Sequence, residues 1–411
     1  MTERNDAATA TGQRELFRPR VVDGSVRSTL DGHVERGYAS GVVALIGFGE
    51  ESQVLTVGVK ALGSAGPMRR DAIFRIASMT KPITAVAAMM LIEEGRLRLD
   101  EPVDRLLPEL ADRRVLRRAD GPLDDTTSAK RPITVEDVLT FQLGLGIVLA
   151  PPEAYPIQRK ITELGLMGFG LPDPTSPHGP DEWTRRLGTL PLMHQPGEQW
   201  MYTTGSNVLG VLIARASDRS LPTFMQERIF DPLGMKDTAF FVPLEKRDRL
   251  LDSYCPKAGE LRLYDAAAQS RWSAPPTFPA GDSGLVSTVD DFFAFSQFML
   301  RRGRVGDRRL LSEASIAAMT KDHLTSEQRV RGQPILGPDH GWGYGMSVAL
   351  NTTMEGIPAG AYGWNGGLGT SWVTDPGSGL TAILMTQTMF ESADPPAIHK
   401  DFWRAVFHPT D

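Results

Sequence analysis

The chain has 411 residues, of which 41% are hydrophobic and 23% charged, and it carries a formal net charge of −6. This composition is ordinary for a globular protein, and the length predicts two or three domains or one larger composite. The slightly acidic balance, without any run of basic residues, argues against a nucleic-acid partner and against an anionic membrane surface.

Other classes of function are disfavoured by motifs that the chain lacks. The single cysteine, Cys255, cannot form an intrachain disulfide. No histidine pair with metal-ligand spacing, no Cys-x-x-Cys and no glycine-rich phosphate-binding loop occurs, so we expect neither a metal nor a cofactor. The first residues lack the apolar core of a signal peptide and no 18-residue apolar run follows, which predicts a cytoplasmic protein without a membrane anchor.

The N-terminal third predicts a tail, a hairpin and a buried helix. Residues 1–19 are polar and expected to be partly disordered. Residues 41–48 and 53–59 are rich in apolar side chains, which predicts two strands that form an antiparallel hairpin. Residues 79–94 are apolar nearly all round, with Pro82 in the first turn and Gly95 as the C-cap, which predicts a buried central helix.

Strand patterns return near the C-terminus. Residues from about 100 to 275 read as helical segments between loops rich in proline and glycine, and four strands are then predicted at 344–350, 361–364, 370–374 and 380–388, before a helix at 396–407. Strands at both ends imply an α+β fold, an α/β sandwich whose antiparallel sheet is built from both termini. We expect residues 20–80 and 282–411 to form this domain and residues 81–281 to form an inserted, mainly helical domain.

A serine and a lysine lie three residues apart at the predicted helix start, in the segment Ser78-Met79-Thr80-Lys81. Residues at i and i+3 lie on one face of a helix, so the Ser78 hydroxyl and the Lys81 amine can touch. A serine hydroxyl is a poor nucleophile until a base takes its proton, and a desolvated lysine can be that base. One such pair is also expected by chance in a chain of this length, so the spacing alone leaves both readings open.

Three further segments follow this pair along the chain and matter once Ser78 is considered as a nucleophile. Tyr202 lies in a turn before a predicted helix, residues 281–288 precede another helix, and residues 362–372 run along one strand, through a glycine turn, into the next. Taken singly, the tyrosine fits a packing role and Gly366 and Gly367 fit an ordinary hairpin.

Together these motifs resemble the serine β-lactamase and penicillin-binding-protein superfamily, and within it the class C-like branch that includes the family VIII carboxylesterases. Ser78-Met79-Thr80-Lys81 matches the S-x-x-K element, Tyr202 matches the tyrosine of Y-x-N, and Trp364-Asn365-Gly366 stands where lactamases carry K-T-G and these esterases often carry W-x-G. The resemblance spans residues 30 to 405 and implies a β-lactamase/transpeptidase-like fold.

The resemblance also implies roles for these residues. Ser78 would attack an acyl carbonyl, and Lys81 and Tyr202 would share the proton transfers, without the sequence deciding which of the two is the base. The backbone N–H groups of Ser78 and Gly367, the latter on the strand after the W-x-G triplet, would form the oxyanion hole.

Two departures from the lactamase pattern narrow the expected substrate. Thr204 replaces the asparagine of Y-x-N, and Trp364 replaces the lysine of K-T-G, which in lactamases faces the carboxylate of the β-lactam. An indole has one N–H donor and no charge, so the substrate-binding segment Trp364, Asn365 and Gly366 should prefer neutral acyl compounds.

We therefore predict a serine hydrolase of carboxylic esters, with acyl transfer to an alcohol possible where water is kept out. The alternatives are β-lactamase or D-amino-acid peptidase activity, and a catalytically inactive binding homologue. The apolar, glycine-rich stretch at 161–171 is read either as lining an acyl or alcohol pocket or as a core-facing loop. The sequence predicts no oligomeric state.

Overall fold

The computed structural model describes residues 24–49, 51–151, 154–166 and 173–408, so the predicted tail at 1–19 lies outside the described residues. One large sheet organises the fold, and its strands come from both ends of the chain. The strands of this antiparallel sheet are β1 (Gly41–Phe48), β2 (Glu51–Gly58), β11 (His340–Trp342), β12 (Ser347–Ala349), β13 (Tyr362–Gly366), β14 (Thr370–Asp375) and β15 (Leu380–Thr386).

The strand order β11-β12-β13-β14-β15-β1-β2 joins the two ends of the chain where β1 pairs with β15. In this pairing Val42 lies opposite Thr386 and Phe48 opposite Leu380. The predicted α+β fold with an antiparallel sheet built from both termini is confirmed. The proposed domain boundaries, 20–80 with 282–411 and 81–281, stay a prediction.

Both faces of the sheet are covered, which explains why β1 is apolar without interruption. Alternate residues of a strand point to opposite faces. Val42, Ala44 and Ile46 pack with α2 (Gly24–Glu35) and α13 (Ala397–Phe407), whereas Val43 and Leu45 pack in the core that contains α10 (Val289–Leu300). The helix α2 was not predicted from the sequence.

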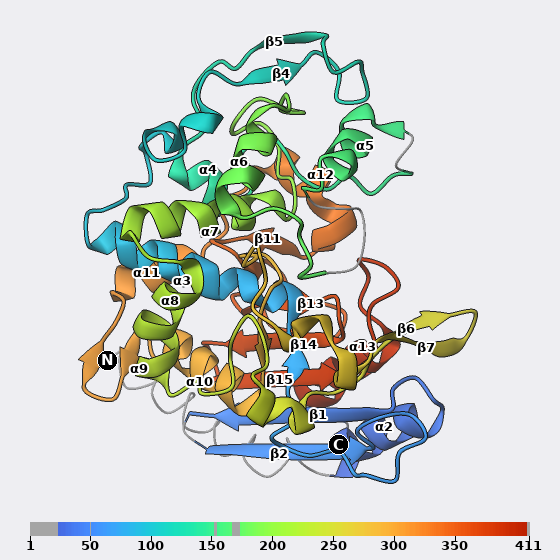
Figure 1. The fold of residues 1–411 in the computed structure, drawn as a ribbon. Helices are drawn as coiled ribbons and strands as arrows, with labels where there is room; N and C mark the ends of the chain where they lie inside the picture. Colours follow the sequence, from blue (N-terminus) through green and yellow to red (C-terminus); the bar gives the residue numbers. More distant parts are fainter. Residues whose placement is uncertain (1–23, 50, 152–153, 167–172, 409–411) are drawn as a thin grey trace.

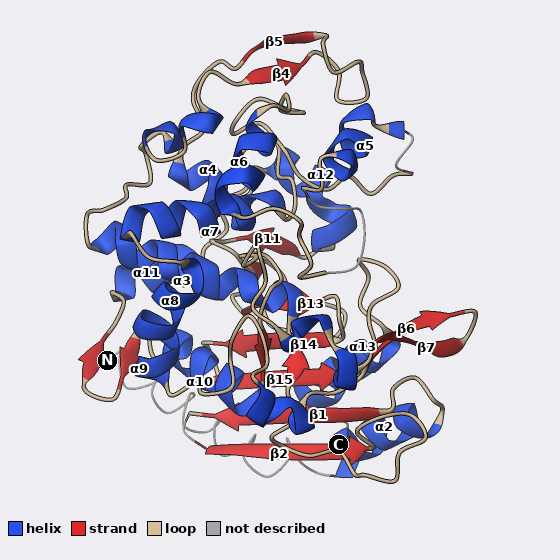
Figure 2. Cartoon of the chain, in the orientation of Figure 1, coloured by secondary structure: helices blue, strands red, loops and turns tan. Residues whose placement is uncertain are grey.

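Most of the remaining helices lie beyond the β11 edge of the sheet, whereas α9 lies next to α10, as the ribbon and its colouring by secondary structure show (Figure 1, Figure 2). The remaining helices are α3 (Thr80–Glu93), α4 (Val135–Leu139), α5 (Pro156–Glu163), α6 (Pro180–Gly188), α7 (Thr204–Ser217), α8 (Leu221–Met225), α9 (Asp231–Leu233), α11 (Glu313–Met319) and α12 (Ser326–Leu336). The predicted helix at 79–94 is α3, and its residues from Thr80 to Leu91 are all buried. Gly95 follows with φ +70°, a conformation that glycine adopts without strain.

Four two-stranded pairs complete the structure, and two of them interrupt the region predicted as helical. The pairs are β3 (Phe74–Arg75) with β8 (Val286–Ser287), β4 (Arg114–Leu116) with β5 (Thr126–Ser128), β6 (Ser253–Lys257) with β7 (Glu260–Asp265), and β9 (Arg304–Val305) with β10 (Arg308–Arg309). The strand predicted at 344–350 is shorter and is preceded by β11. The helix α8 leaves α geometry after Met225, and the chain continues as a π-helical turn. No described helix has both the length and the apolar character needed to cross a membrane.

Candidate active site

Ser78 lies just before the N-terminal end of α3, in a 3-10 turn of residues 77–79 that leads into the helix. The residue before it, Ala77, has φ +43°, in the left-handed region that is costly for any residue except glycine. Lys81 follows one turn into α3, and its Nζ donates a hydrogen bond of 3.0 Å to Ser78 Oγ. The structure therefore brings the two predicted side chains into direct contact.

Lys81 is almost completely buried, with only 1% of its surface exposed. Its Nζ also donates to the backbone carbonyl of Asp282 at 2.8 Å, and it lies 4.5 Å from the centre of the Tyr202 ring. No ion pair joins Lys81 to a carboxylate within the described ranges. Lys81 is therefore a buried amine held by uncharged acceptors beside a serine hydroxyl.

The carbonyl that accepts from Lys81 belongs to a segment anchored on two helices. Thr84 Oγ1 of α3 donates to the carbonyl of Gly281 at 2.7 Å, and the Asp282 N–H donates to Asn207 Oδ1 of α7 at 3.3 Å. A Cβ at Gly281 would lie 2.4 Å from the Ser206 carbonyl oxygen, so this close approach requires glycine. The sequence motif at 281–288 is therefore the part that fixes the direction of the Lys81 amine.

Tyr202 lies just before α7, as predicted, and the one residue between them is strained. Thr203 has φ +87°, and Thr204 is the first residue of the helix. The side chain of Tyr202 is half-buried, and its ring faces the Lys81 amine. Tyr202 Oη accepts a hydrogen bond of 2.6 Å from Trp364 Nε1.

Trp364 belongs to a cluster of aromatic rings that surrounds Tyr202. The ring centres of the neighbours lie 5.6–6.2 Å from that of Tyr202, and they belong to Phe141, Trp200, Trp342 and Trp364. Phe141, like Ala77 and Thr203, has a positive φ, of 62°. Backbone strain in the described part of the chain thus recurs around the predicted site, and aromatic rings surround Tyr202.

Gly366, the glycine of the W-x-G segment, packs against the backbone just before Ser78. A Cβ at Gly366 would lie 2.2 Å from the carbonyl oxygen of Ile76, so the end of β13 is pressed against the chain two residues before the serine. Gly367 lies in the turn after β13 rather than on a strand, which corrects the prediction from the sequence. A Cβ there would meet nothing within 4 Å, so a methyl group at this position would have open space. Asn365 is half-buried beside it.

The asparagine missing at position 204 has a substitute one turn later. Thr204 is buried and its backbone N–H donates to the Tyr202 carbonyl at 3.3 Å, with its hydroxyl in no hydrogen bond to Lys81. The buried amide of Asn207 instead positions Asp282, and through it Lys81. Sequence reasoning gave Asn207 no role, because its partner is a backbone N–H that no motif identifies.

Comparison with known proteins decides the family. The Beta-lactamase family description matches residues 26–401. The chain belongs to the beta-lactamase family.

Two relatives and one solved structure illustrate the range of this family. Protein Rv1367c of Mycobacterium tuberculosis is 35% identical, over 88% of each chain. Esterase EstB of Burkholderia gladioli is 30% identical, over 88% of this chain and 89% of the other. The structure of EstCE1, described as a hydrolase with promiscuous acyltransferase activity, has a TM-score of 0.78 at 24% identity, covering 98% and 99% of the two chains, and shows the shared fold.

In this member of the beta-lactamase family, a cavity of about 350 Å³ opens beside Tyr202. Its apolar wall includes Ile147, Leu149, Trp200 and Ile335, and Arg331 of α12 lies among its polar residues. The stretch at 161–171, predicted to line a pocket or to face the core, does not contribute to this wall where it is described. Residues 161–163 are the last residues of α5, and the buried Leu166 faces the core. Residues 167–171 lie outside the described residues.

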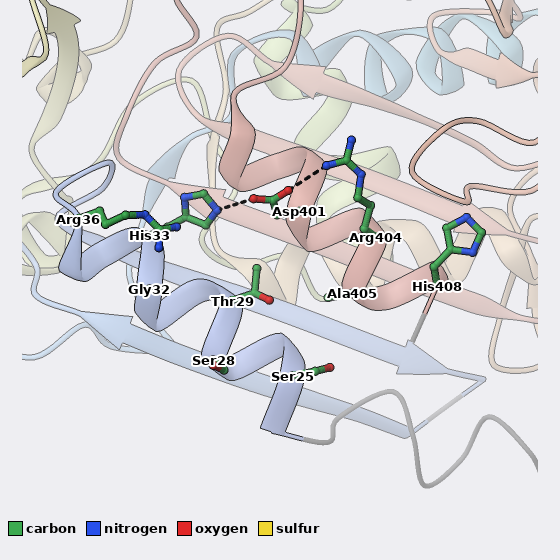
Figure 3. Close-up of a pocket in the computed structure, with 10 residues that line it drawn as sticks. All are labelled: Ser25, Ser28, Thr29, Gly32, His33, Arg36, Asp401, Arg404, Ala405 and His408. Atoms are coloured by element: carbon green, nitrogen blue, oxygen red, sulfur yellow. Dashed lines mark hydrogen bonds and ion pairs between the residues drawn. The ribbon is translucent and has the colours of Figure 1, made fainter. Parts of the chain in front are cut away.

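A second hollow, of about 370 Å³, lies between α2 and α13 and contains none of the predicted site residues (Figure 3). In this hollow Asp401 accepts one hydrogen bond from His33 Nε2 and another from Arg404 Nη1, both of 3.0 Å. Within the described residues, no group of three or more histidine, cysteine, aspartate or glutamate side chains is arranged to hold a metal ion.

Proposed function

We propose that the protein is a serine hydrolase that cleaves carboxylic esters through an acyl-enzyme at Ser78. The observation that carries this proposal is the hydrogen bond of 3.0 Å between Lys81 Nζ and Ser78 Oγ inside an otherwise apolar, aromatic site. Membership of the beta-lactamase family and the similarity to Esterase EstB support it.

The first half of the reaction forms the acyl-enzyme. Ser78 Oγ attacks the ester carbonyl while its proton passes to the Lys81 and Tyr202 pair. The carbonyl oxygen becomes an oxyanion, which the backbone N–H groups of Ser78 and Gly367 would hold. The C–O bond to the alcohol then breaks, and the same pair returns the proton to the leaving oxygen.

In the second half a water molecule takes the place of the alcohol. The Lys81 and Tyr202 pair accepts a proton from the water as it attacks the acyl carbon. Ser78 Oγ then leaves with that proton, and the acid is released. An alcohol in place of water would give acyl transfer by the same steps.

Trp364 favours esters over β-lactams in this scheme. Its indole N–H is engaged with Tyr202 Oη, and it has no charge with which to bind a lactam carboxylate. β-Lactamase or D-amino-acid peptidase activity is therefore the second candidate, and we expect it to be slower than ester hydrolysis.

A fluorophosphonate probe tests the nucleophile directly. The intact protein should gain the mass of the adduct, and Ser78→Ala should remove it. Ser283→Ala is the matched control, because Ser283 is a second half-buried serine, adjacent to the partner carbonyl of Lys81. Labelling that persists in Ser78→Ala and disappears in Ser283→Ala would show that the nucleophile is misassigned.

A substrate panel tests the reaction class. We expect p-nitrophenyl esters to be turned over faster than a chromogenic cephalosporin or a D-alanyl peptide. Faster turnover of the cephalosporin than of every ester would make lactam hydrolysis the better assignment.

A further inference from the structure

The residues that line the cavity beside Tyr202 are of two kinds, and we call the two sets its apolar wall and its polar wall. The apolar wall includes Ile147, Trp200 and Ile335. A cavity of about 350 Å³ is large enough for a small ligand fragment such as a fused pair of aromatic rings. Gly332 makes this wall possible, because a Cβ at that position of α12 would lie 3.0 Å from the Trp200 ring.

The other wall carries three hydrogen-bond donors. Arg331 Nη1 donates to Gln199 Oε1 at 3.0 Å, and its Nη2 donates to Glu327 Oε1 at 2.6 Å. A guanidinium has five N–H groups, so these two bonds leave donors that can meet a ligand. Because the amide oxygen of Gln199 is occupied by Arg331, its NH₂ group is the part available to a ligand.

The third donor is His194, and burial lowers the pKa of its imidazole, which is therefore neutral at pH 7 with one ring N–H. Glu198 and Arg331 are the charged groups that act on this ring, in opposite directions. A wall made of a guanidinium, an amide NH₂ and an imidazole N–H suits an acceptor-rich or anionic group.

We propose that this cavity binds the alcohol part of the ester, and that it selects an aryl or similarly bulky apolar alcohol with a carboxylate at the end remote from the ester. The assignment to the alcohol part rests on the proposed function, in which Tyr202 returns a proton to the leaving oxygen. The group attached to that oxygen then lies on the side of Tyr202, where the cavity is. The anionic end reaches Arg331, His194 and Gln199.

Two acetate esters of naphthols test the polar wall. We expect 6-acetoxy-2-naphthoate, which carries the carboxylate, to have a higher kcat/KM than 2-naphthyl acetate. Arg331→Met should lower kcat/KM for the anionic ester roughly tenfold, mainly through KM, because it removes a charged hydrogen-bond donor. The same variant should change the neutral ester less than about twofold, since a guanidinium adds little to binding of an uncharged ring.

Two further variants sharpen this test. Glu327→Gln removes the carboxylate that competes for Arg331 and should increase the preference for the anionic ester. Arg308→Met, at an exposed position of β10, alters the net charge equally and should leave the preference unchanged. A preference that falls equally in Arg308→Met and Arg331→Met would overturn the inference, because the effect would then come from overall charge.

The assignment of the cavity to the alcohol part is tested by a bulkier side chain on the apolar wall, which leaves less space in the cavity. Ile335→Trp should slow 2-naphthyl acetate, which places its rings on the alcohol, more than vinyl 2-naphthoate, which places them on the acyl group. The reverse order would overturn the inference while leaving an esterase. If wild-type protein neither hydrolyses these esters nor labels at Ser78, the proposed function itself fails, so the two failures are distinguishable.

Discussion

At the scale of single residues, the contact between Trp364 and Tyr202 distinguishes this site most clearly from one in which a lysine at position 364 faces the carboxylate of a β-lactam. The indole Nε1 lies 2.6 Å from the phenol oxygen. An N–H donor to a phenol oxygen stabilises negative charge on that oxygen and occupies one of its lone pairs. We infer that Trp364 positions Tyr202 for proton transfer, in addition to its predicted place in substrate binding.

The substitution Trp364→Phe keeps an aromatic ring and removes the donor. We expect kcat/KM for a p-nitrophenyl ester at pH 7 to fall on the order of tenfold, the effect of one lost hydrogen bond to a developing charge. Steady-state kinetics of the purified variant and the wild-type protein on the same ester measure this loss.

Trp342→Phe provides the matched control. Trp342 is fully buried in the same aromatic cluster, 4.8 Å from the Trp364 ring, but its Nε1 has no hydrogen-bond partner in the described structure. Its replacement should leave kcat/KM close to the wild-type value. Equal losses of kcat/KM in both variants would mean that the cluster acts only by packing.

At the scale of secondary-structure elements, the end of β13 sets the distance between the sheet and the serine. The two neighbouring glycines there differ sharply, because a Cβ at Gly366 would clash with the Ile76 carbonyl, whereas one at Gly367 would meet open space. Gly366→Ala should therefore destabilise the fold by about 1–3 kcal/mol, the usual range for overpacking. Gly367→Ala should change the free energy of unfolding by less than about 1 kcal/mol, and urea unfolding of the two variants measures the difference. Equal stabilities would contradict the close packing at Gly366.

The sequence predicted the elements whose pattern is strong and local. The apolar run of α3 and the strands β1 and β15 were predicted within a few residues of their bounds, because burial on every side leaves a nearly continuous apolar signal. The helix α2 was missed because only Val26, Leu30 and His33 are buried, among serine, threonine and glycine residues that favour turns.

The same reasoning explains which parts of the site were predictable. Ser78 and Lys81 are joined by helical spacing, which a sequence displays directly. The hydrogen bond from Trp364 to Tyr202 joins residues 162 positions apart, and the Asp282 partner of Lys81 is a backbone carbonyl. No residue type identifies such an acceptor, so this part of the site required the fold.

At the scale of the whole molecule, the last helix holds the sheet together from the face opposite α10. His399 of α13 is fully buried, and its Nδ1 lies 2.7 Å from Ser371 Oγ on β14. On the neighbouring α2, His33 pairs with Asp401 of α13 at 3.0 Å (Figure 3). His33 thus links α2 to α13, and His399 links α13 to the central sheet.

Burial, with a smaller contribution from the charge of His33, lowers the pKa of His399 to about 3. The unfolded chain binds a proton at this histidine near pH 6.5, whereas the folded chain does not, so the stability from neutral His399 is present above pH 6.5 and is lost as the pH falls toward 3. One such group changes the free energy of unfolding by up to about 1.4 kcal/mol per pH unit within this window.

We therefore expect urea unfolding between pH 6.5 and pH 5 to show a steeper loss of stability in the wild-type protein than in His399→Asn. The asparagine can still reach Ser371 through the position of Nδ1 but has no proton to gain. His194 and His340, whose pKa values burial also lowers, contribute equally to both proteins and cancel in the comparison. Parallel slopes in the two proteins would mean that His399 is protonated without unfolding, so that the contact between α13 and β14 does not govern the acid stability of the fold.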